Sequence, residues 1–360
     1  MSNDETTTSH EGQADYRPAR LWSVRPYLPS DLPGLLELYR LTFGRERTEE
    51  EFHWKLLGRS SPFDTIWVAA TEERVVGQHA GIPMQLKLGD RTVAAMHAVE
   101  AMTHPDHRRE GMLTELGGAL YSRWRDQASP LIMGLPHAGW GSRAGYLGYR
   151  PAFPLRWLWR PLDPVALVKN KLRPGSTKSG VLPQMPVRYS VGKTKVASVT
   201  EADSRFDGLW ARTGPSYKNA AVRDTAWVRW RYLDPSGQNF SVLLAEREGE
   251  PTGYIAYRMH PLGSRLIGRI ADIFVDPSDR ESLRVLVRAA LSDMTRRGAD
   301  SVTCLTAAGS PLHRSLRSHG FLWNRGEYQA SFILLSDTVP WEAISNPSEW
   351  LLTGGDFDVI

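Results

Sequence analysis

Apolar and polar positions follow two different periods along the chain. Residues near 65–70, 75–87 and 91–104 form short runs rich in apolar and β-branched side chains, which predict strands. Residues 111–126 instead carry apolar side chains at a 3.6-residue period, which predicts a helix with one face packed on a sheet. Further strands are expected at 22–27, 130–135 and 150–160, and helices at 31–42, 48–57 and 138–146. This order predicts a mixed α/β (α+β) domain rather than a Rossmann-type alternation.

The second half of the chain repeats landmarks of the first half at nearly constant spacing. An offset of 176 residues relates Trp54, Ala69 and Gly77 to Trp230, Ala245 and Gly253. An offset of 172 relates Pro105 and the pair Gly148-Tyr149 to Pro277 and the pair Gly320-Phe321. The four missing residues fall in an expected hairpin, where length changes are tolerated. Landmarks that recur in the same order predict two copies of one fold in tandem.

The repeat sets the expected domain boundaries. We expect a disordered tail at 1–20, a first domain at 21–162, a linker at 163–189, a second domain at 190–340 and a C-terminal tail at 341–360. The linker contains the run KNKLRPGSTKSG, whose proline, glycine and serine residues are typical of connecting segments.

Composition narrows the classes of protein that the chain can represent. The 360 residues are 41% hydrophobic and 23% charged, as in globular proteins, and hold no apolar run long enough to span a membrane. The single cysteine, Cys304, excludes a disulfide framework and a cysteine-based zinc site, and no other paired metal-ligand spacing occurs. The polar N-terminus lacks the apolar core of a secretion signal, so we expect a cytoplasmic protein. A net charge of only +4 gives no reason to expect a nucleic-acid partner.

The strongest chemical signal is the segment EAMTHPDHRREGMLTEL. A strand is expected to end at Pro105, and Gly111 is expected to open a helix after a short basic loop. The unpaired N–H groups and partial positive charge of a helix start suit a diphosphate. Gly111 allows the backbone to approach a ligand closely, and Arg108 and Arg109 add positive charge. The alternative is an ordinary strand–loop–helix with a pair of surface arginines.

This segment resembles the acyl-CoA-binding motif of the GNAT superfamily of acetyltransferases, Arg/Gln-x-x-Gly-x-Gly/Ala. It matches from Arg108 to Leu113, although Leu113 replaces the small last residue. The resemblance implies two GNAT folds, each a mixed, largely antiparallel sheet flanked by helices. It also implies acetyl-CoA as co-substrate and no metal. The cofactor-binding residues that it implies are Ala101, Met102, Thr103, Arg108, Arg109, Glu110, Gly111, Met112, Leu113 and Thr114.

The corresponding segment of the second half departs from the motif. Leu283 stands where the first half has Gly111, and Asp276, Asp279 and Glu281 place negative charge where a diphosphate would lie. We therefore expect a degenerate second copy that binds no CoA and that shapes the substrate site or packs against the first copy.

Four residues are candidates for catalysis or substrate contact. His97 and Glu100 precede the loop on the same strand and are candidate general bases, although strand alternation places them on opposite faces unless a bulge intervenes. Tyr146 is the candidate acid, because the position that carries a tyrosine in many GNAT enzymes is Ala144 here, and Tyr149 is expected to pack in the core. His137 is a candidate substrate contact.

These observations favour an N-acyltransferase. It would move an acetyl or other short acyl group directly from acyl-CoA to a primary amine of a small molecule, such as an amino sugar or a natural-product intermediate. Cys304 is expected in a buried strand, without an acyl-enzyme role. Two alternatives stay open: a tRNA-dependent aminoacyl transferase of the tandem-GNAT peptidoglycan-branching type, and a CoA-binding scaffold without activity. We expect no membrane partner, and a homodimer stays open.

Overall fold

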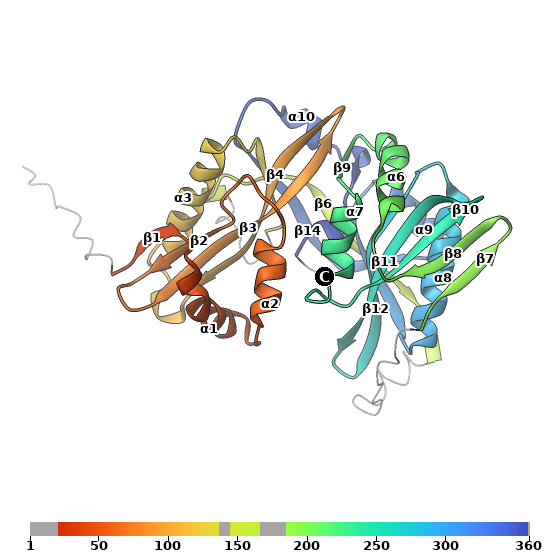
Figure 1. The fold of residues 1–360 in the computed structure, drawn as a ribbon, viewed down its shortest axis with the longest axis horizontal. Coiled ribbons are helices and arrows are strands. Elements are labelled where there is room, and N and C mark those ends of the chain that lie inside the picture. Colours follow the sequence, from red (N-terminus) through yellow and green to blue (C-terminus); the bar gives the residue numbers. More distant parts are fainter. Residues whose placement is uncertain (1–20, 137–144, 166–184, 359–360) are drawn as a thin grey trace, which may run out of the picture.

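A continuous sheet runs through the whole computed structural model, which describes residues 21–136, 145–165 and 185–358 and omits the side chains of 324–327. Its strands follow the order β1-β2-β3-β4-β5-β14-β6-β13-β12-β11-β10-β8-β7, with β9 and β15 attached to the side of β3. Most neighbouring strands are antiparallel, and helices cover the sheet (Figure 1). The expected mixed, largely antiparallel fold class is confirmed.

The N-terminal half contributes the first six strands. They are β1 (Ser23–Pro26), β2 (Ile66–Ala70), β3 (Val75–Leu88), β4 (Arg91–Thr103), β5 (Leu131–Gly134) and β6 (Arg150–Pro161). Its helices are α1 (Leu32–Phe43), α2 (Glu49–Phe52) and α3 (Met112–Asp126), with a π-helical turn, η2 (His53–Leu57), directly after α2. Each element lies within a few residues of its expected range.

The C-terminal half contributes the other strands. They are β7 (Arg188–Val191), β8 (Thr194–Val199), β9 (Asn219–Ala221), β10 (Ser241–Arg247), β11 (Glu250–Leu262), β12 (Arg265–Val275), β13 (Ser301–Ala307), β14 (Leu322–Leu334) and β15 (Trp350–Leu351). Its helices are α6 (Ser204–Thr213), α7 (Thr225–Val228), α8 (Arg280–Arg296), α9 (Pro311–Ser318) and α10 (Trp341–Ile344), with a second π-helical turn, η6 (Arg229–Leu233), after α7. Within the described ranges, no helix is long and apolar enough to cross a membrane.

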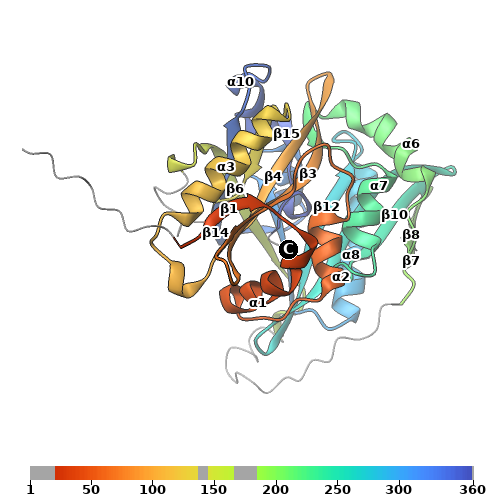
Figure 2. The ribbon, with the colours of Figure 1, turned by 60° about the vertical axis from the view of Figure 1, so that its left-hand side comes forward.

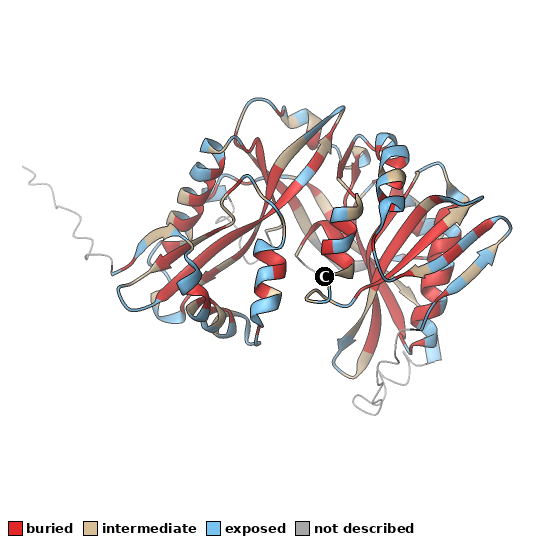
Figure 3. Cartoon of the chain, viewed as in Figure 1, coloured by how far each residue is buried: buried red, intermediate tan, exposed pale blue. Residues whose placement is uncertain are grey.

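Close packing of α3 on β3 explains the apolar period of residues 111–126. Met112, Leu116 and Trp124 are all buried on one face of α3. A Cβ atom at Gly77 of β3 would lie 2.4 Å from the sulfur of Met112, so the helix can approach this closely only because a glycine lies beneath it. Figures 1 and 2 show α1 on the opposite side of these strands from α3. The sheet strands between them are largely buried (Figure 3).

The last strands of the two halves change places at the centre of the sheet. β14 lies between β5 and β6, and β6 pairs with β13. The strand that we expected to complete the first domain thus lies beside strands of the second domain. Pairing partners depend on tertiary contacts, which the period-2 pattern of a strand does not encode. The exchange joins the two halves into one sheet and leaves no free strand edge between them.

Trp54 and Trp230, which the 176-residue offset relates, meet in space. The indole N–H of Trp54 donates to the carbonyl oxygen of Trp230 at 2.6 Å. The indole N–H of Trp230 donates to the carbonyl oxygen of Trp54 at 2.7 Å. Their rings stack at 5.8 Å between centroids. Each tryptophan lies in a π-helical turn, so the contact is reciprocal in both its atoms and its local backbone.

Residues 341–358 form part of the core rather than the tail that we expected. Trp350 is fully buried and stacks on Phe332 of β14, with 5.6 Å between ring centroids. Strand β15 pairs in parallel with β9, and Phe357 is buried near the N-terminal half. The apolar residues of this segment bury a large surface, and this burial stabilises an ordered conformation.

Candidate active site

The strands β4 and β5 separate at the centre of the N-terminal half. They run parallel over only two registered pairs, Met96–Ile132 and His97–Met133. Beyond these pairs β5 ends at Gly134, whereas β4 continues to Thr103. In the described part of the chain, one backbone edge of β4 therefore has no partner strand over residues 98–103. Such an edge can bind an extended ligand through its N–H and C=O groups.

A β-bulge interrupts β4 on this open stretch. The register with β3 shifts so that Glu100 and Ala101 together lie opposite the single residue His79. Glu100 adopts a left-handed backbone conformation with φ of 50°. Strand alternation had placed His97 and Glu100 on opposite faces, but the extra residue changes the phase and both side chains line one cavity.

This cavity has a volume of about 280 Å³ and lies where β4 and β5 separate. Its apolar lining includes Phe43, Val99 and Leu135. Its lining also includes five titratable side chains, from β3, β4, the residue before β6 and the C-terminal segment: His79, His97, Glu100, Tyr149 and Asp358. A small, partly apolar space with convergent titratable groups is the usual form of an active site.

Glu100 is held in a buried ion-pair network. Arg47 donates two hydrogen bonds to its carboxylate, both at 2.8 Å, and the Lys55 ammonium lies 2.5 Å from it. Lys55 also pairs with Asp358 at 2.5 Å. Burial alone would raise the pKa of Glu100, but Lys55 and Arg47 together lower it to about 2. Both oxygens of this carboxylate are already bonded to Arg47, and one of them also to Lys55, so the geometry does not support Glu100 as the general base.

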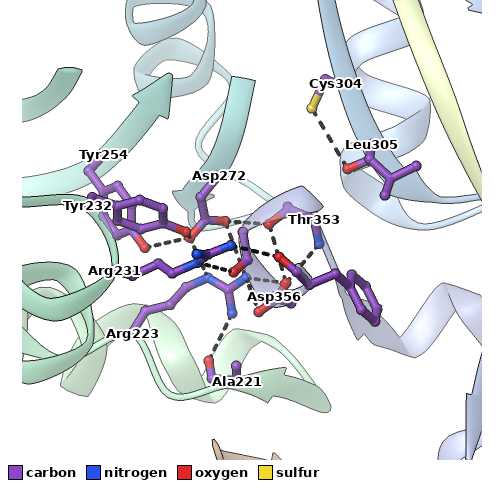
Figure 4. A network of polar contacts seen from close by, with 12 residues as sticks. Ala221, Arg223, Arg231, Tyr232, Tyr254, Asp272, Cys304, Leu305, Thr353 and Asp356 are labelled. Carbon is purple, nitrogen blue, oxygen red and sulfur yellow. Dashed lines mark hydrogen bonds and ion pairs between the residues drawn. The ribbon is translucent and has the colours of Figure 1, made fainter. Parts of the chain in front are cut away.

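A matching ion pair in the C-terminal half supports a structural role for Glu100. Arg223, which lies 176 residues after Arg47, donates to Asp272, which lies 172 residues after Glu100. Both side chains of this second pair are fully buried, and Asp356 accepts from the same guanidinium at 2.8 Å (Figure 4). The arginine–carboxylate pair thus recurs in a half that lacks the cavity residues of the first half.

His97 presents an unprotonated nitrogen in the cavity wall. Its Nδ1 lies 3.1 Å from the carbonyl oxygen of Met133, which can only accept, so Nδ1 carries the proton and Nε2 carries the lone pair. Nε2 is buried and has no hydrogen-bond partner among the described residues. Burial lowers the pKa of His97 to about 4, which keeps the ring neutral at neutral pH. A neutral imidazole with a free lone pair can accept a proton from a bound amine.

Tyr149 packs in the core, as expected, and also lines the cavity. Its hydroxyl lies 3.0 Å from that of Tyr121, which in turn lies 2.7 Å from Nε2 of His79. Burial raises the pKa of Tyr149, so its phenol stays protonated and can act as a proton donor. The expected acid, Tyr146, is 78% exposed and does not line the cavity. The sequence signal that could have pointed to Tyr149 is the pair Gly148-Tyr149, because it lies directly before β6.

The start of α3 lies at the end of the open β4 edge. Gly111 is the N-cap residue, with φ of 80°, and Arg109 is also left-handed, with φ of 71°. The carbonyl of Gly111 accepts from the N–H groups of Thr114 and Glu115. Among the expected cofactor residues, Met102 and Met112 are buried, Ala101, Thr103 and Leu113 are half-buried, and Arg108, Arg109, Glu110, Gly111 and Thr114 are exposed. His137 lies outside the described residues.

The start of α8 in the C-terminal half is already occupied by a carboxylate. Asp279 caps this helix by accepting from the N–H of Ser282 at 3.0 Å, and it pairs with Arg247 at 3.1 Å. Leu283 is buried at the position that matches Gly111. This arrangement supports the expectation that the second half has no diphosphate site. In the described ranges, no group of three or more His, Cys, Asp and Glu side chains could hold a metal ion.

We expect the two buried histidines to make stability fall at mildly acidic pH. The pKa values of His79 and His97 are lowered from 6.5 to about 4 in the fold, so the unfolded chain binds more protons between these values. The free energy of unfolding should therefore decrease from pH 6.5 toward pH 4, by up to roughly 3 kcal/mol for each histidine. Urea unfolding at pH 7 and pH 5 measures this decrease.

The variant His97→Asn isolates the contribution of one ring. Its free energy of unfolding should change less between pH 7 and pH 5 than that of the wild type, because one titrating group is gone. His53→Asn serves as the control, since His53 is exposed. An equal pH dependence in all three proteins would contradict the assignment.

Comparisons with known proteins agree with this arrangement. Residues 23–151 match the family model described as an acetyltransferase (GNAT) domain. No curated protein sequence matches the chain.

Solved structures resemble the chain over both halves. A GCN5-related N-acetyltransferase from Anabaena variabilis superposes with a TM-score of 0.61 at 17% identity, covering 88% of this chain and 73% of that one. N-myristoyltransferase from Saccharomyces cerevisiae, with bound myristoyl-CoA, superposes with 0.59 at 13% identity, covering 89% and 85%. A probable N-acyltransferase from Enterococcus faecalis superposes with 0.59 at 14% identity, covering 87% and 72%. At these identities the likeness shows a shared fold.

Proposed function

We propose that this GNAT-domain protein transfers an acyl group from acyl-CoA to a primary amine of a small molecule. The observation that carries the proposal is the open edge of β4, which connects the start of α3 at one end to the cavity with His97 and Tyr149 at the other. A long thioester needs such a path, because its diphosphate, its amide-containing arm and its reactive carbonyl are recognised at three different places.

Each part of the cosubstrate has a matching part of the chain. The free N–H groups at the start of α3, after Gly111, suit the diphosphate, and Arg108 and Arg109 supply positive charge beside them. The backbone of Ala101 to Thr103 can hydrogen-bond the pantetheine amides in the manner of an added strand. The thioester then reaches the cavity, whose volume of about 280 Å³ suits an acetyl or other short acyl group.

The cavity residues account for the proton transfers of direct acyl transfer. The substrate ammonium loses its first proton to water, and the neutral amine attacks the thioester carbonyl to form a C–N bond. A backbone N–H of the open β4 edge can stabilise the oxyanion. The C–S bond then breaks, the Tyr149 hydroxyl protonates the leaving thiolate, and His97 Nε2 accepts the second proton of the nitrogen, which becomes strongly acidic as the amide forms. His97 passes this proton on to the Tyr149 phenolate through water, so that both side chains return to their starting state.

Calorimetric titration with acetyl-CoA tests the proposal most directly. We expect saturable binding of about one equivalent, because the matching helix start of the C-terminal half is capped by Asp279 and has Leu283 in place of Gly111. Parallel titration with myristoyl-CoA tests acyl length, and the small cavity predicts weaker binding. Binding without turnover on any amine would favour a CoA-binding scaffold. No binding of either thioester would contradict the proposal and favour an aminoacyl-tRNA donor.

The variant Tyr149→Phe tests the proposed acid. Loss of this hydroxyl should lower kcat by roughly 100-fold and leave the dissociation constant of acetyl-CoA nearly unchanged. Steady-state kinetics with a competent amine measures the first quantity and calorimetry measures the second. Tyr146→Phe is the matched comparison, since Tyr146 is exposed. A loss of kcat in Tyr146→Phe but not in Tyr149→Phe would restore the acid expected from the sequence.

A further inference from the structure

Three unpartnered hydrogen-bond donors lie side by side on neighbouring strands of the C-terminal half. Arg258 of β11 lies directly opposite Arg269 of β12, and Arg269 lies directly opposite Thr303 of β13. Residues in register on adjacent strands project from the same face of a sheet. We call these three residues the donor row.

The donor row lacks the partners that its charge requires. The Nε atoms of Arg258 and Arg269 and the hydroxyl of Thr303 are buried without a hydrogen-bond partner in the part of the chain that the structure describes. Thr303 is only 9% exposed, and the described residues form no ion pair with either arginine. Like charges directly opposite each other destabilise a sheet, and each unsatisfied buried donor costs about 1–3 kcal/mol.

The surroundings of the donor row add positive charge and aromatic surface. Burial and the charges of Arg269, Arg231 and Arg45 lower the pKa of Arg258 to about 10. The guanidinium of Arg269 lies 5.4 Å from the ring centroid of Trp157, and that of Arg258 lies 5.9 Å from that of Phe240. Aromatic faces orient a guanidinium without neutralising it, so both cations keep their capacity to bind an anion.

Arg231 and the C-terminal segment connect the donor row to the catalytic cavity. The positive charge of Arg231 lowers the pKa of both Arg258 and His97. Arg231 also donates to the carbonyl oxygen of Phe357, whose ring packs against the imidazole of His97. Figure 1 shows the β11–β12 hairpin beside the C-terminal end of the chain. Arg231 thus links the surroundings of the donor row with those of His97.

We propose that the donor row binds an anionic oxygen group, a carboxylate or a phosphate, on the amine acceptor. The inference rests on the proposed function, because it assigns the acceptor of the same acyl transfer. Two guanidinium groups and a hydroxyl offer several hydrogen-bond donors and two positive charges. A carboxylate or phosphate can accept these hydrogen bonds and neutralise the charge, whereas a neutral sugar or an alkylamine cannot. The acceptor is therefore a zwitterionic or anionic amine rather than a simple cationic amine.

Anion binding can be measured without turnover. Inorganic phosphate and acetate should each protect the wild-type protein against thermal unfolding, and the stronger of the two identifies the preferred anion. In the double variant Arg258→Met/Arg269→Met this protection should be clearly reduced, and any protection by phosphate that remains comes from the proposed diphosphate site at the start of α3. Equal protection of the wild type and the double variant would overturn the inference even if acyl transfer is confirmed. Stronger protection of the wild type than of the double variant would support the anion site even if acyl transfer is refuted.

Kinetics with matched acceptors then assigns the anion to the substrate. Glucosamine 6-phosphate is compared with glucosamine, and β-alanine with β-alaninamide. We expect the preferred anionic acceptor to have a KM at least about tenfold below that of its neutral counterpart, and Arg269→Met to remove this difference with kcat and acetyl-CoA affinity unchanged. Equal KM values within both pairs for the wild-type protein would contradict the assignment.

The stability of the variants separates binding from a structural role. Removal of one of two opposed, unpaired cations should leave the melting temperature unchanged or raise it, since no ion pair is lost. The exposed Arg188 of β7 supplies the control variant Arg188→Met, which should change neither stability nor KM. A clear fall in melting temperature for Arg269→Met alone, without a change in KM, would show that the residue serves the fold.

Discussion

Replacement of Gly111 by tryptophan is expected to abolish acyl-CoA binding while the protein stays folded. Gly111 caps the start of α3, and a Cβ atom built on it would meet no protein atom within 4 Å. An indole group at this position therefore fills the space proposed for the diphosphate rather than the core. We expect the dissociation constant of acetyl-CoA to rise by at least roughly 100-fold, or about 2.7 kcal/mol, in calorimetric titration.

Two further variants separate the bulk of the indole from backbone strain. Gly111→Ala introduces the same strain at φ of 80° without a large side chain, so it should weaken binding far less. Gly249→Trp places tryptophan at another left-handed glycine with open space around it, in the β10–β11 turn of the other half, and should leave affinity unchanged. Unchanged affinity in Gly111→Trp would remove the diphosphate site from the start of α3.

The sequence predicted the elements of the fold well, because each one depends on a local pattern. The apolar period of residues 111–126 corresponds to the buried face of α3, and the run at 91–104 corresponds to β4. Pairing could not be predicted in the same way. Residues 150–160 form the expected strand, but its neighbours are β13 and β14, which are distant in the chain. The choice between such partners depends on packing that no short window contains.

The candidate site was predicted in part, and the failures have local causes. His97 and Glu100 both reach the cavity because a one-residue bulge changes the strand phase, and a bulge leaves no clear sequence signal. Tyr149 does pack in the core, as expected, but its place beside the cavity was not predicted, because a buried aromatic residue and a buried acid look alike in a sequence. Asp358 could not be found, because only the tertiary fold brings the C-terminal segment to Lys55.

We propose that the two halves are tandem copies of one fold. Two pairs of contacts support the proposal: the reciprocal hydrogen bonds of Trp54 and Trp230, and the matching ion pairs Arg47–Glu100 and Arg223–Asp272. Burial of an ion pair carries a large desolvation penalty, so such pairs are not expected to arise often by chance. Descent of both halves from one unit explains more simply why the pair recurs at related positions. The copies then diverged: one keeps Gly111 at its helix start, and the other closes its helix start with Asp279.

The network around Arg223 fixes the C-terminal segment that reaches the cavity. Asp272 accepts from Arg223 and from the hydroxyl of Thr353, and Asp356 accepts from the same guanidinium (Figure 4). Burial and the charge of Asp272 raise the pKa of Asp356, whereas Arg223 lowers it. The segment that ends at Asp358 is therefore held by one buried cation between two carboxylates, and its position depends on that cation.

Replacement of Arg223 by methionine should accordingly cause the largest loss of stability in the chain. The methionine leaves two buried carboxylates without a cation, and removal of one partner from a buried network costs roughly 3–5 kcal/mol in the free energy of unfolding. Arg205→Met is the matched control, because Arg205 pairs with Asp203 and Glu246 at the surface and should cost less than about 1 kcal/mol. Urea unfolding measures both values, and a similar small loss in the two variants would contradict a structural role for the network.

If Arg223→Met stays folded, its acetyl-CoA affinity should be retained while kcat falls, since the C-terminal segment contacts His97 through Phe357 but does not reach the start of α3.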